Sequence, residues 1–596
     1  MFLKPSKKMC ETNIRILAVT GFLAILEIVL ALLAGFITYG QADSSAVFKV
    51  FTDAGMRSVW LGANALVGAG ALLVFTERYK RHQDIKISDT ITKGSSGWAS
   101  DAEIKSKLDF GWSSAGIVLG RRGNSPVVYP AAAWENRNVA VLGPPDTGKS
   151  RAYVRPNLFH AVNSEMSVIC TDPKGELTRD FRKYLEKKGY IVRVFNLVNF
   201  VHGDRWNPLA EVRDDVDAQM MCDVIISSTS VPGRKSGDQF WERTEMNLLK
   251  ALILYVVNEY PLEKRTMASV YDILASGDVK IIDGLFNPLS NSHPAKLAYN
   301  IFRQSEPKVQ SGAISGLGTR LQVFQNKIVR DFTEHSDISL TMPGNRKCAY
   351  FCVLSDTDST FYFLSSLFFS FLFIKLTRLA DLTPGGVLKV PVSFILDEFC
   401  NIGHIPDFTK KLSTMRSRGI GCSIIFQSLP QLMQFYSDKA WETILANCST
   451  FLVMGVKDET TAKYIADYAG KITIKTVSRT KDAGFAKFLD FGKETVSDAD
   501  RYLIMPDELF RMPKNEAIAL ISGIRPVKLE KLDFSRCPEY SKLEPEDLTD
   551  YMPKWVENES VVVEVHSEPK EIPQEIPEEK PPEKPKKKKD SKAFWK

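Results

Sequence analysis

The cysteines of this chain form no metal or redox motif. Nine cysteines are spread over 596 residues, with no C-x-x-C pair and no histidine at the spacing of a metal ligand. This argues against a zinc module and against a thioredoxin-like dithiol. An odd number of cysteines also fits a reducing compartment, where disulfides are rare.

The chain also lacks any extreme of charge or composition. Its 77 basic and 71 acidic residues leave a formal charge of only +6, too little to indicate a nucleic-acid partner without a local basic patch. Hydrophobic residues at 44% and charged residues at 25% argue against a disordered, collagen-like or disulfide-rich chain. No internal repeat is visible. The length exceeds that of a single hydrophobic core, so we expect two or more folded units.

Two long apolar runs stand near the amino end. Residues 16–38 are apolar except for Glu27, and residues 59–75 form a second run rich in Gly and Ala. The first run is too long for a cleaved signal peptide, and together the runs predict two packed transmembrane helices. Basic residues precede the first run and follow the second, which predicts that both chain ends lie in the cytoplasm. Glu27 marks either packing within a helix bundle or a contact with a partner.

A third apolar run, residues 361–374, is shorter. It ends at Lys375 and follows a polar stretch, 356–360, that is typical of a helix cap. We therefore predict a buried core helix here rather than a membrane span. Just before it, Cys348 and Cys352 fall on one face of an apolar run, which predicts a buried strand rather than a ligand pair.

From about residue 110 onward, short β-rich runs alternate with amphipathic helical stretches. This pattern predicts a mostly parallel sheet covered by helices on both faces. The strands we expect are 138–142, 167–171, 190–195, 349–354, 392–396, 422–426 and 450–454. A long stretch of helical periodicity between the third and fourth strands predicts an inserted helical subdomain.

These patterns divide the chain into five parts. Beyond residue 542 the sequence is rich in Pro, Glu and Lys and cannot bury enough apolar surface to fold, so we expect a disordered, solvated tail. The expected parts are a membrane anchor (1–82), the first part of an α/β domain (83–211), an all-helical insertion (212–343), the second part of the α/β domain (344–541) and the charged tail (542–596).

One loop matches the P-loop pattern G-x-x-x-x-G-K-[ST], with an apolar strand before it and a helical stretch after it. Such a loop wraps nucleotide phosphates with backbone N–H groups, while its lysine reaches the β- and γ-phosphates and its hydroxyl ligates Mg²⁺. A chance match on a turn is the alternative. The predicted ATP and Mg²⁺ site comprises Gly143, Pro144, Pro145, Asp146, Thr147, Gly148, Lys149 and Ser150.

A second motif is the buried strand 392–396, which delivers Asp397 and Glu398 at its carboxyl end. Open α/β sheets bind their ligands at that edge. The pair predicts a Walker B motif in which Asp397 holds Mg²⁺ and Glu398 activates the attacking water. The alternative is that two acidic residues simply begin a solvated loop.

Gln427 ends the strand 422–426 and is predicted to sit beside the γ-phosphate. In motor proteins with a P-loop and a Walker B motif, a glutamine at this place couples ATP hydrolysis to movement. An ordinary loop glutamine is the alternative, and the residue by itself does not decide between them.

Several strings occur in the order and spacing of one family. They are TDPKGEL (171–177), RWNPL (205–209), LDEFCNIGHIPDF (396–408), MRSRGI (415–420) and FQSLPQL (426–432). Over roughly residues 110–535 the chain resembles the type IV coupling proteins, the TraG-like and VirD-type conjugation ATPases.

The resemblance implies a RecA-like P-loop NTPase domain with an inserted all-helical subdomain that takes part in substrate recognition. It also implies a homo-hexameric ring in the bacterial plasma membrane, with the ATPase domain in the cytoplasm. The implied substrate is single-stranded DNA bound to a relaxase, which the ring passes to a type IV secretion channel. Two other functions stay open, a docking receptor for secreted effector proteins and a double-stranded DNA pump of the cell-division type. That pump normally ends in a winged DNA-reading domain, for which the tail of this chain leaves no room.

The same resemblance points to Arg416 as an arginine finger that acts on the neighbouring subunit's ATP. Arg418 is the second choice, and Lys439 is a further candidate for a phosphate contact. The alternative is that the two arginines are solvated or bind DNA phosphates.

Overall fold

The computed structural model describes residues 87, 88, 90–131, 136–229, 239–480 and 493–558, together with isolated positions between 29 and 65. It contains two compact units. The larger comprises residues 96–471 and the chain from 502 onward, and the smaller takes in residues up to 95 together with 472–501. The predicted membrane spans, 16–38 and 59–75, lie outside the described residues except for isolated positions, and so does Glu27.

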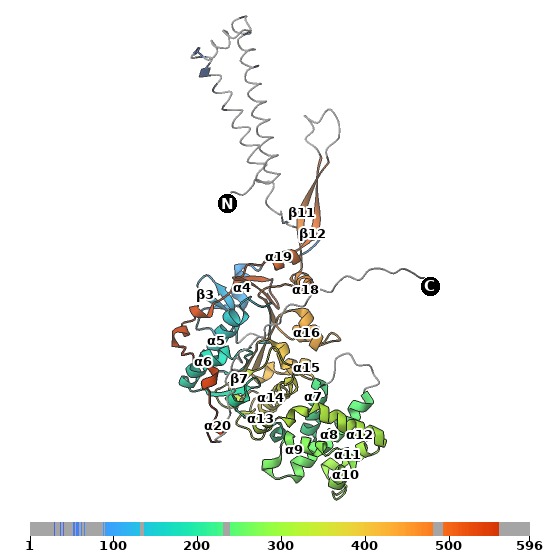
Figure 1. Cartoon of the computed structure of the whole chain (residues 1–596). Coiled ribbons are helices and arrows are strands. Elements are labelled where there is room, and N and C mark those ends of the chain that lie inside the picture. The colour runs from blue at the N-terminus through green and yellow to red at the C-terminus, as the bar shows by residue number, and fades with distance from the viewer. Residues whose placement is uncertain are drawn as a thin grey trace, which may run out of the picture. The chain divides into compact units, whose positions relative to one another are not determined.

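A twelve-stranded sheet forms the centre of the larger unit (Figure 1). Seven neighbouring strands run parallel, in the order β10-β4-β9-β8-β5-β7-β6. These are the seven strands expected from the sequence. β5 and β8 agree residue for residue, and the others are shifted by one or two residues at an end. Their bounds are β4 Val139–Leu142, β5 Ser167–Thr171, β6 Ile191–Asn196, β7 Cys348–Val353, β8 Val392–Leu396, β9 Ile420–Phe426 and β10 Thr450–Val453.

The remaining five strands extend this sheet beyond β10 and run antiparallel to one another. The sequence patterns did not predict them. Contacts in this extension join the two ends of the domain: Arg121 of β2 pairs with Glu530 of β14, and the N–H of Ala99 donates to the carbonyl of Pro526 at 2.9 Å. The bounds are β1 Asp109–Phe110, β2 Gly116–Arg122, β3 Ser125–Pro130, β13 Glu516–Ile521 and β14 Val527–Glu530.

Helices cover both faces of the sheet (Figure 1). Right-handed crossovers account for the arrangement, because the chain moves across the sheet in one direction through α5 and α6 and in the other through α14, α15 and α16. The bounds are α5 Arg155–Asn163, α6 Glu176–Lys187, α14 Tyr362–Leu382, α15 Phe408–Thr414 and α16 Leu429–Phe435. The other helices of the sheet domain include α4 Asp101–Lys107, α17 Ala440–Ala446, α18 Glu459–Ala469 and α19 Pro506–Phe510.

α14 contains the third apolar run. Among the described residues it is the one helix with the length and apolar composition of a membrane span, but 78% of its most apolar stretch is buried inside the protein. Its Phe368 stacks on Phe195 of β6, with ring centroids 4.2 Å apart. The prediction of a core helix is therefore confirmed. Cys348 and Cys352 are likewise buried, in β7.

The described residues between β6 and β7 form helices and no strand. Most of these helices form a cluster at one end of the larger unit (Figure 1). A buried ionic group attaches this insertion to the sheet domain. Asp217 of α7 is fully buried and contacts both Lys375 and Arg378 of α14, at 3.7 and 2.6 Å. The bounds are α7 Asp215–Thr229, α8 Gln239–Glu259, α9 Met267–Ala275, α10 Val279–Phe286, α11 Pro294–Arg303, α12 Pro307–Arg320 and α13 Lys327–Phe332.

The predicted tail begins too early in the chain. Residues 542–558 are described, include α20 Lys554–Asn558, and pack on the sheet domain instead of extending into solvent. Tyr551 donates a hydrogen bond to the Asp204 carboxylate at 2.6 Å, and the indole N–H of Trp555, a buried residue, donates to the carbonyl of Gly203. The prediction rested on the Pro, Glu and Lys content of the region, which gives no sign that Tyr551 and Trp555 pack on the sheet domain. The rest of the predicted tail lies outside the described residues.

The smaller unit contains a two-stranded sheet that the sequence did not predict, formed by β11 Lys471–Thr480 and β12 Lys493–Tyr502. Residues that follow the predicted membrane spans pair with it, since Ile87 bridges to Ile474 and Ser95 to Ile472. Thr90 adds a hydrogen bond to Asp498 at 2.7 Å.

Candidate nucleotide-binding site

The P-loop joins β4 to a helix, as its sequence context predicts. A π-helical turn, Ser150–Val154, follows it and continues into α5. The two glycines of the P-loop are both required, Gly148 by its backbone conformation and Gly143 by close packing. Gly148 has a φ of +78°, and a Cβ atom on Gly143 would lie 2.5 Å from Oγ1 of Thr147. The loop is thus as tight as a phosphate cradle needs to be.

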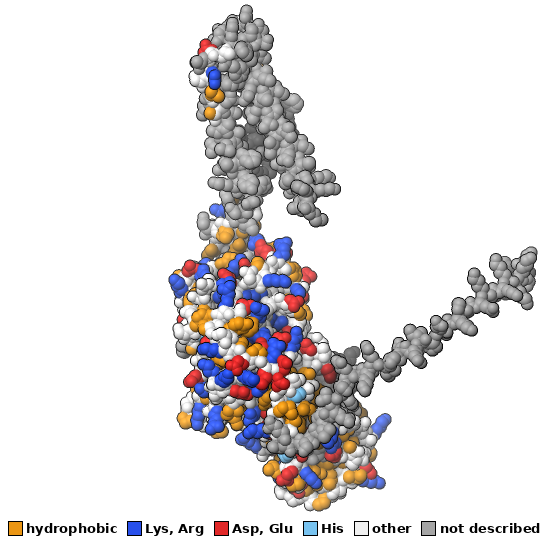
Figure 2. Space-filling view, turned by 60° about the vertical axis from the view of Figure 1, so that its left-hand side comes forward, with side chains coloured by type: hydrophobic (Ala, Val, Ile, Leu, Met, Phe, Trp, Pro, Cys, Tyr) orange, Lys and Arg blue, Asp and Glu red, His pale blue; other side chains and the backbone are white. Residues whose placement is uncertain are grey.

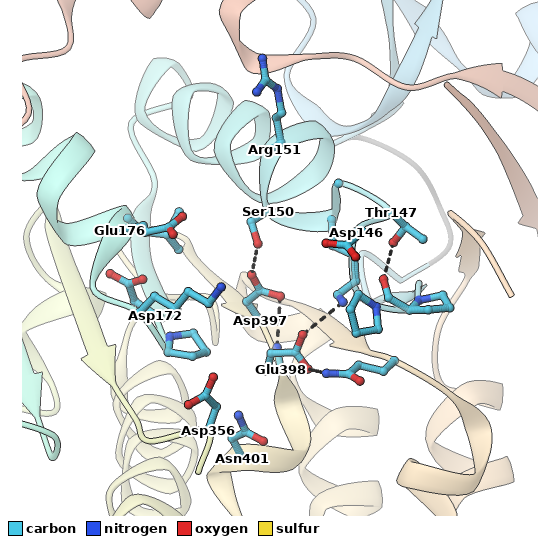
Figure 3. Close-up of a pocket in the computed structure, with 18 of the residues that line it drawn as sticks. Asp146, Thr147, Ser150, Arg151, Asp172, Glu176, Asp356, Asp397, Glu398 and Asn401 are labelled. Carbon is cyan, nitrogen blue, oxygen red and sulfur yellow. Dashed lines mark hydrogen bonds and ion pairs between the residues drawn. The ribbon is translucent and has the colours of Figure 1, made fainter. Parts of the chain in front are cut away.

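Asp397 lies directly beside the P-loop hydroxyl. The Oγ of Ser150 donates a hydrogen bond to Oδ2 of Asp397 at 2.6 Å (Figure 3). Burial raises the pKa of Asp397 to about 6, against the opposing effect of the Ser150 hydrogen bond, and the neighbouring carboxylate of Glu398 raises this pKa further. The Ser150 hydroxyl and the buried Asp397 carboxylate thus lie side by side. Oxygen groups of these two kinds ligate Mg²⁺ in phosphate sites.

Glu398 occupies a strained backbone conformation. Its φ is +50°, in the left-handed region that non-glycine residues rarely adopt and that is found at functional sites. One carboxylate oxygen lies 3.1 Å from Nζ of Lys149, and the other accepts a hydrogen bond from Nε2 of Gln427 at 2.9 Å. The structure therefore brings together Lys149, Glu398 and Gln427, three residues that the sequence predicted separately.

A pocket of about 570 Å³ contains this group (Figure 3). It opens at the carboxyl ends of five adjacent parallel strands, β4, β9, β8, β5 and β7. The lining residues are Pro144, Pro145, Asp146, Thr147, Gly148, Lys149, Ser150, Arg151, Arg155, Asp172, Pro173, Lys174, Glu176, Leu177, Asp356, Asp397, Glu398, Asn401, Gln427 and Gln431.

Several of these residues were missed as site residues. Asp172 directly follows β5, and Asp356 comes three residues after β7. The signal was present in the sequence, because polar residues that follow neighbouring parallel strands meet at one edge of a sheet. The order of the strands was needed to use it.

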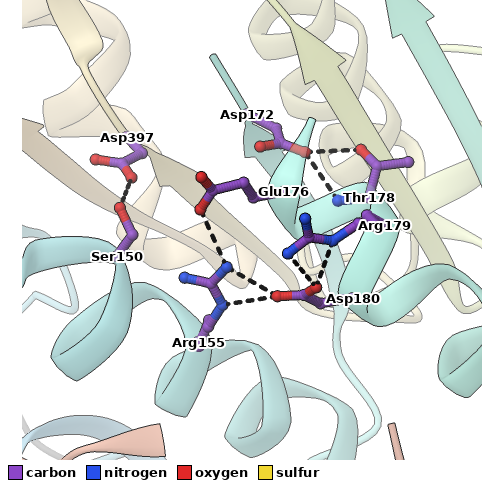
Figure 4. A network of polar contacts seen from close by, with 8 residues as sticks. All are labelled: Ser150, Arg155, Asp172, Glu176, Thr178, Arg179, Asp180 and Asp397. Carbon is purple, nitrogen blue, oxygen red and sulfur yellow. Dashed lines mark hydrogen bonds and ion pairs between the residues drawn. The ribbon is translucent and has the colours of Figure 1, made fainter. Parts of the chain in front are cut away.

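A polar network holds the pocket wall formed by α5 and α6 (Figure 4). The guanidinium of Arg155 donates to Asp180 at 2.8 Å and to Glu176 at 3.3 Å. Asp172 accepts two hydrogen bonds from Thr178, one from the backbone N–H and one from the hydroxyl, both at 2.8 Å. Burial nevertheless raises the pKa of Asp172 above its ordinary value. These contacts tie the segment after β5 to the helix that follows the P-loop.

The basic residues suggested for contact with ATP across a subunit boundary do not line this pocket. Arg416 is exposed in a 3-10 turn, Arg416–Arg418, before the amino end of β9, whereas the pocket lies at the carboxyl ends of the strands. Arg418 contacts Asp381 at 2.8 Å. Lys439 is exposed before α17 and has a φ of +64°.

The sequence profile of a family described as "Type IV secretory system Conjugative DNA transfer" matches residues 97–561, most of the chain. Protein VirD4 of Agrobacterium fabrum is 25% identical over 412 residues, which cover 67% of this chain and 59% of that protein. A conjugal transfer protein TraG of Escherichia coli is 25% identical over 404 residues, which cover 63% of this chain and 62% of that protein. The aligned region thus spans less than two thirds of the length of both relatives.

Solved structures of the plasmid coupling protein TrwB resemble the chain in fold. The complex of TrwB with a non-hydrolysable ATP analogue has a TM-score of 0.56 at 16% identity and covers 76% of this chain and 96% of that one. At this identity the likeness shows the fold, a RecA-like α/β domain with a large mixed sheet. The profile match reaches from before β1 into the segment that carries Trp555 and includes every residue of the pocket. The chain therefore belongs to the type IV secretory system conjugative DNA transfer family.

Proposed function

We propose that this protein is a membrane-anchored ATPase that couples ATP hydrolysis to the transfer of relaxase-bound single-stranded DNA into a type IV secretion channel. The observation that carries the proposal is the contact of Ser150 with Asp397 beside the Lys149–Glu398–Gln427 group, within the region that the family profile matches.

The proposed roles follow from these contacts. The P-loop backbone and Lys149 bind the phosphates, and Ser150 and Asp397 hold Mg²⁺. When bound, Mg²⁺ supplies positive charge that offsets the charge of the phosphate oxygens. Glu398 accepts the proton of the water that attacks the γ-phosphorus, and Gln427 fixes the direction of the Glu398 carboxylate by its hydrogen bond.

Burial of Asp397 supports the metal role. Because its pKa is about 6, it is ionised at neutral pH, and a nearby cation would favour the ionised form further. Asp397 contacts the Ser150 hydroxyl, whereas the Glu398 carboxylate contacts Lys149 and Gln427. The two adjacent carboxylates are therefore suited to different tasks, one to metal binding and one to proton transfer.

DNA transfer is supported by the family and by the names of the relatives, which include conjugal transfer proteins. Figure 2 shows basic and acidic side chains interspersed among the described residues of the face in view, without one dominant basic field. DNA contact on that face would therefore receive little electrostatic support. A path through the centre of a ring is the arrangement we propose.

Membrane anchoring and a ring of six subunits complete the proposal. The two apolar runs near the amino end support anchoring in the bacterial plasma membrane, with the ATPase domain in the cytoplasm. In a ring, Arg416 is proposed to reach the γ-phosphate bound by a neighbouring subunit. Its place at the amino end of β9, away from its own pocket, fits action on another subunit.

The decisive experiment is crosslinking of transferring DNA in mating cells. Wild-type protein should crosslink to the transferred strand, and Lys149→Ala should abolish transfer. Lys514→Ala, which removes an exposed lysine away from the pocket, serves as the matched control and should transfer normally. Secreted effectors that crosslink in place of DNA would favour the receptor function, and crosslinks to duplex DNA alone would favour the pump.

A further inference from the structure

Lys531 contacts the P-loop from outside the pocket. It follows β14 directly, and its backbone N–H donates to the carbonyl of Asn515 at 2.7 Å. Its ammonium donates to the carbonyl of Thr147 at 2.9 Å and to the carbonyl of Met454 at 2.7 Å. Lys531 is not among the residues that line the pocket, so it holds the loop from behind.

The site around this ammonium is built from close backbone contacts. The N–H of Met454 donates to the carbonyl of Leu142, which places the end of β10 beside the start of the P-loop. A Cβ atom on Gly455 would lie 2.7 Å from Cγ2 of Thr147. Lys531 therefore joins three elements, β14, the end of β10 and the P-loop, at one point. Burial lowers the pKa of Lys531 to about 8, so the ammonium form predominates at neutral pH.

The position of the Thr147 carbonyl determines where the next N–H points. The carbonyl of Thr147 and the N–H of Gly148 belong to one peptide plane, and in a trans peptide these two groups point in opposite directions. The structure contains no cis peptide bond among the described residues. An ammonium that holds the carbonyl behind the loop therefore directs the Gly148 N–H toward the opposite side, where the pocket lies.

The peptide is also held from within the loop. The hydroxyl of Thr147 donates to the carbonyl of Pro144 at 2.7 Å, which closes the turn. Gly148 has the freedom to rotate its backbone that a residue with a side chain lacks, and beyond its own chain neighbours no heavy atom is recorded within 4 Å of the place a Cβ would take. Without the ammonium, the carbonyl of Thr147 would lose the contact that holds it behind the loop, and Gly148 would do little to keep the peptide from turning.

We propose that Lys531 is a positioning residue for nucleotide binding, which orients the Thr147–Gly148 peptide so that the Gly148 N–H faces the phosphates. The inference rests on the proposed ATP site and adds to it a residue from the far end of the domain. Lys531 acts through the peptide and does not itself touch the nucleotide.

The test compares nucleotide binding and turnover by the full-length protein in detergent. Lys531→Met should weaken binding of ADP and ATP about tenfold, because a charged donor and two carbonyl contacts are lost. The KM for ATP should rise to a similar degree while kcat changes little, since the peptide contact is the same in the ground state and the transition state. Lys531→Arg, whose guanidinium can serve both carbonyls, should restore affinity. Lys514→Met removes a lysine from the loop that carries Asn515 and should bind nucleotide as the wild type does.

Equal ADP affinity of Lys531→Met and the wild type would overturn the inference while leaving the proposed function intact. Failure of the wild type to bind ADP or ATP would instead overturn the proposed function. If Lys531→Met does not fold, Lys531→Gln and Lys531→Arg decide the matter. The Gln variant should bind ADP several-fold more weakly than the Arg variant, and equal affinities would refute the positioning role.

Discussion

Replacement of Glu398 by Gln should strengthen ATP binding and slow ATP hydrolysis. The ammonium of Lys149 lies 3.1 Å from the Glu398 carboxylate, and both side chains are largely shielded, at 7% and 19% exposure. Lys149 is also the group expected to bind the γ-phosphate. The γ-phosphate and Glu398 therefore compete for one ammonium, and removal of the carboxylate charge should favour the phosphate.

The size of the effect follows from the hydrogen bond that changes. In the variant the Lys149 ammonium keeps a neutral amide acceptor and loses an ion pair, which for a partly exposed pair is worth about 1 kcal/mol. ATP should therefore bind roughly fivefold more tightly to Glu398→Gln than to the wild type. ADP, which has no γ-phosphate, should show a smaller gain. Hydrolysis should fall by about 10² to 10⁴, because the amide cannot accept a proton from water.

Equilibrium titration with fluorescent ATP and ADP analogues measures the first effect, and single-turnover phosphate release measures the second. Glu459→Gln is the matched control, because its carboxylate contacts only Lys463 among the ion pairs of the described residues and lies on the surface of α18. Weaker ATP binding combined with near-normal hydrolysis would refute the reasoning, since it would mean that Glu398 holds the nucleotide and does not activate water.

Four further outcomes are expected. Lys149→Ala should abolish ATP hydrolysis and DNA transfer while membrane insertion persists, and wild-type turnover by the purified variant would contradict the site assignment. Deletion of residues 1–82 should leave a soluble protein that binds nucleotide but assembles and transfers poorly, because the spans raise the local concentration of subunits; full transfer by this fragment would count against an anchoring role. Arg416→Ala should lower DNA-free ATPase activity, and mixing it with Glu398→Gln subunits should recover part of that activity; a normal DNA-free rate of Arg416→Ala alone would exclude the finger role. Asp217→Asn should lower the free energy of unfolding by about 3 kcal/mol in a urea titration, because it leaves the buried ammonium of Lys375 with Glu211, at 3.4 Å, as its remaining carboxylate; an unchanged midpoint would show that the Glu211 contact is sufficient.

The parallel half of the sheet was predictable because its strands are bounded by clear polar signals. β8 lies between Pro391 and Asp397, and its predicted and observed bounds agree. β9 begins at Ile420, two residues before its predicted start. The prediction began late because glycine, here Gly421, is typical of turns. In the sheet, Gly421 pairs with Ser393 and lies against Arg137, so that its small size has a packing reason.

The antiparallel extension and the packed segment before the tail were not predictable in the same way. β2 with β3 and β13 with β14 form local hairpins, and the two hairpins are joined by a contact between distant parts of the chain, the pairing of Arg121 with Glu530. Tyr551 and Trp555 lie in a region of unfavourable composition, and only their partners around Gly203 and Asp204 show that they are anchored. Composition averages over a window and cannot detect two aromatic residues with specific partners.

Within the site, motif residues were predictable and supporting residues were not. Lys149, Ser150, Asp397 and Glu398 belong to patterns whose chemistry constrains their spacing, and the structure brings them together. Lys531 belongs to no pattern, since a lysine that binds two carbonyl groups leaves no mark on its neighbours in sequence. The roles of the motif residues stay predictions until the variants are measured.

The strand order has a consequence for synthesis of the protein on the ribosome. β4, which leads into the P-loop, takes its two sheet neighbours from β9 and β10, and β9 begins about 280 residues after β4 ends. At about 5 to 20 residues per second, β4 waits roughly 15 to 60 s for its first partner. The helices between β6 and β7 make mostly local contacts and can fold in that interval. A message truncated just before residue 420 would thus yield a folded helical subdomain and four parallel strands that can pair with one another, while β4 and its P-loop would lack both sheet neighbours. Such a product is a substrate for proteases and chaperones rather than a partial ATPase.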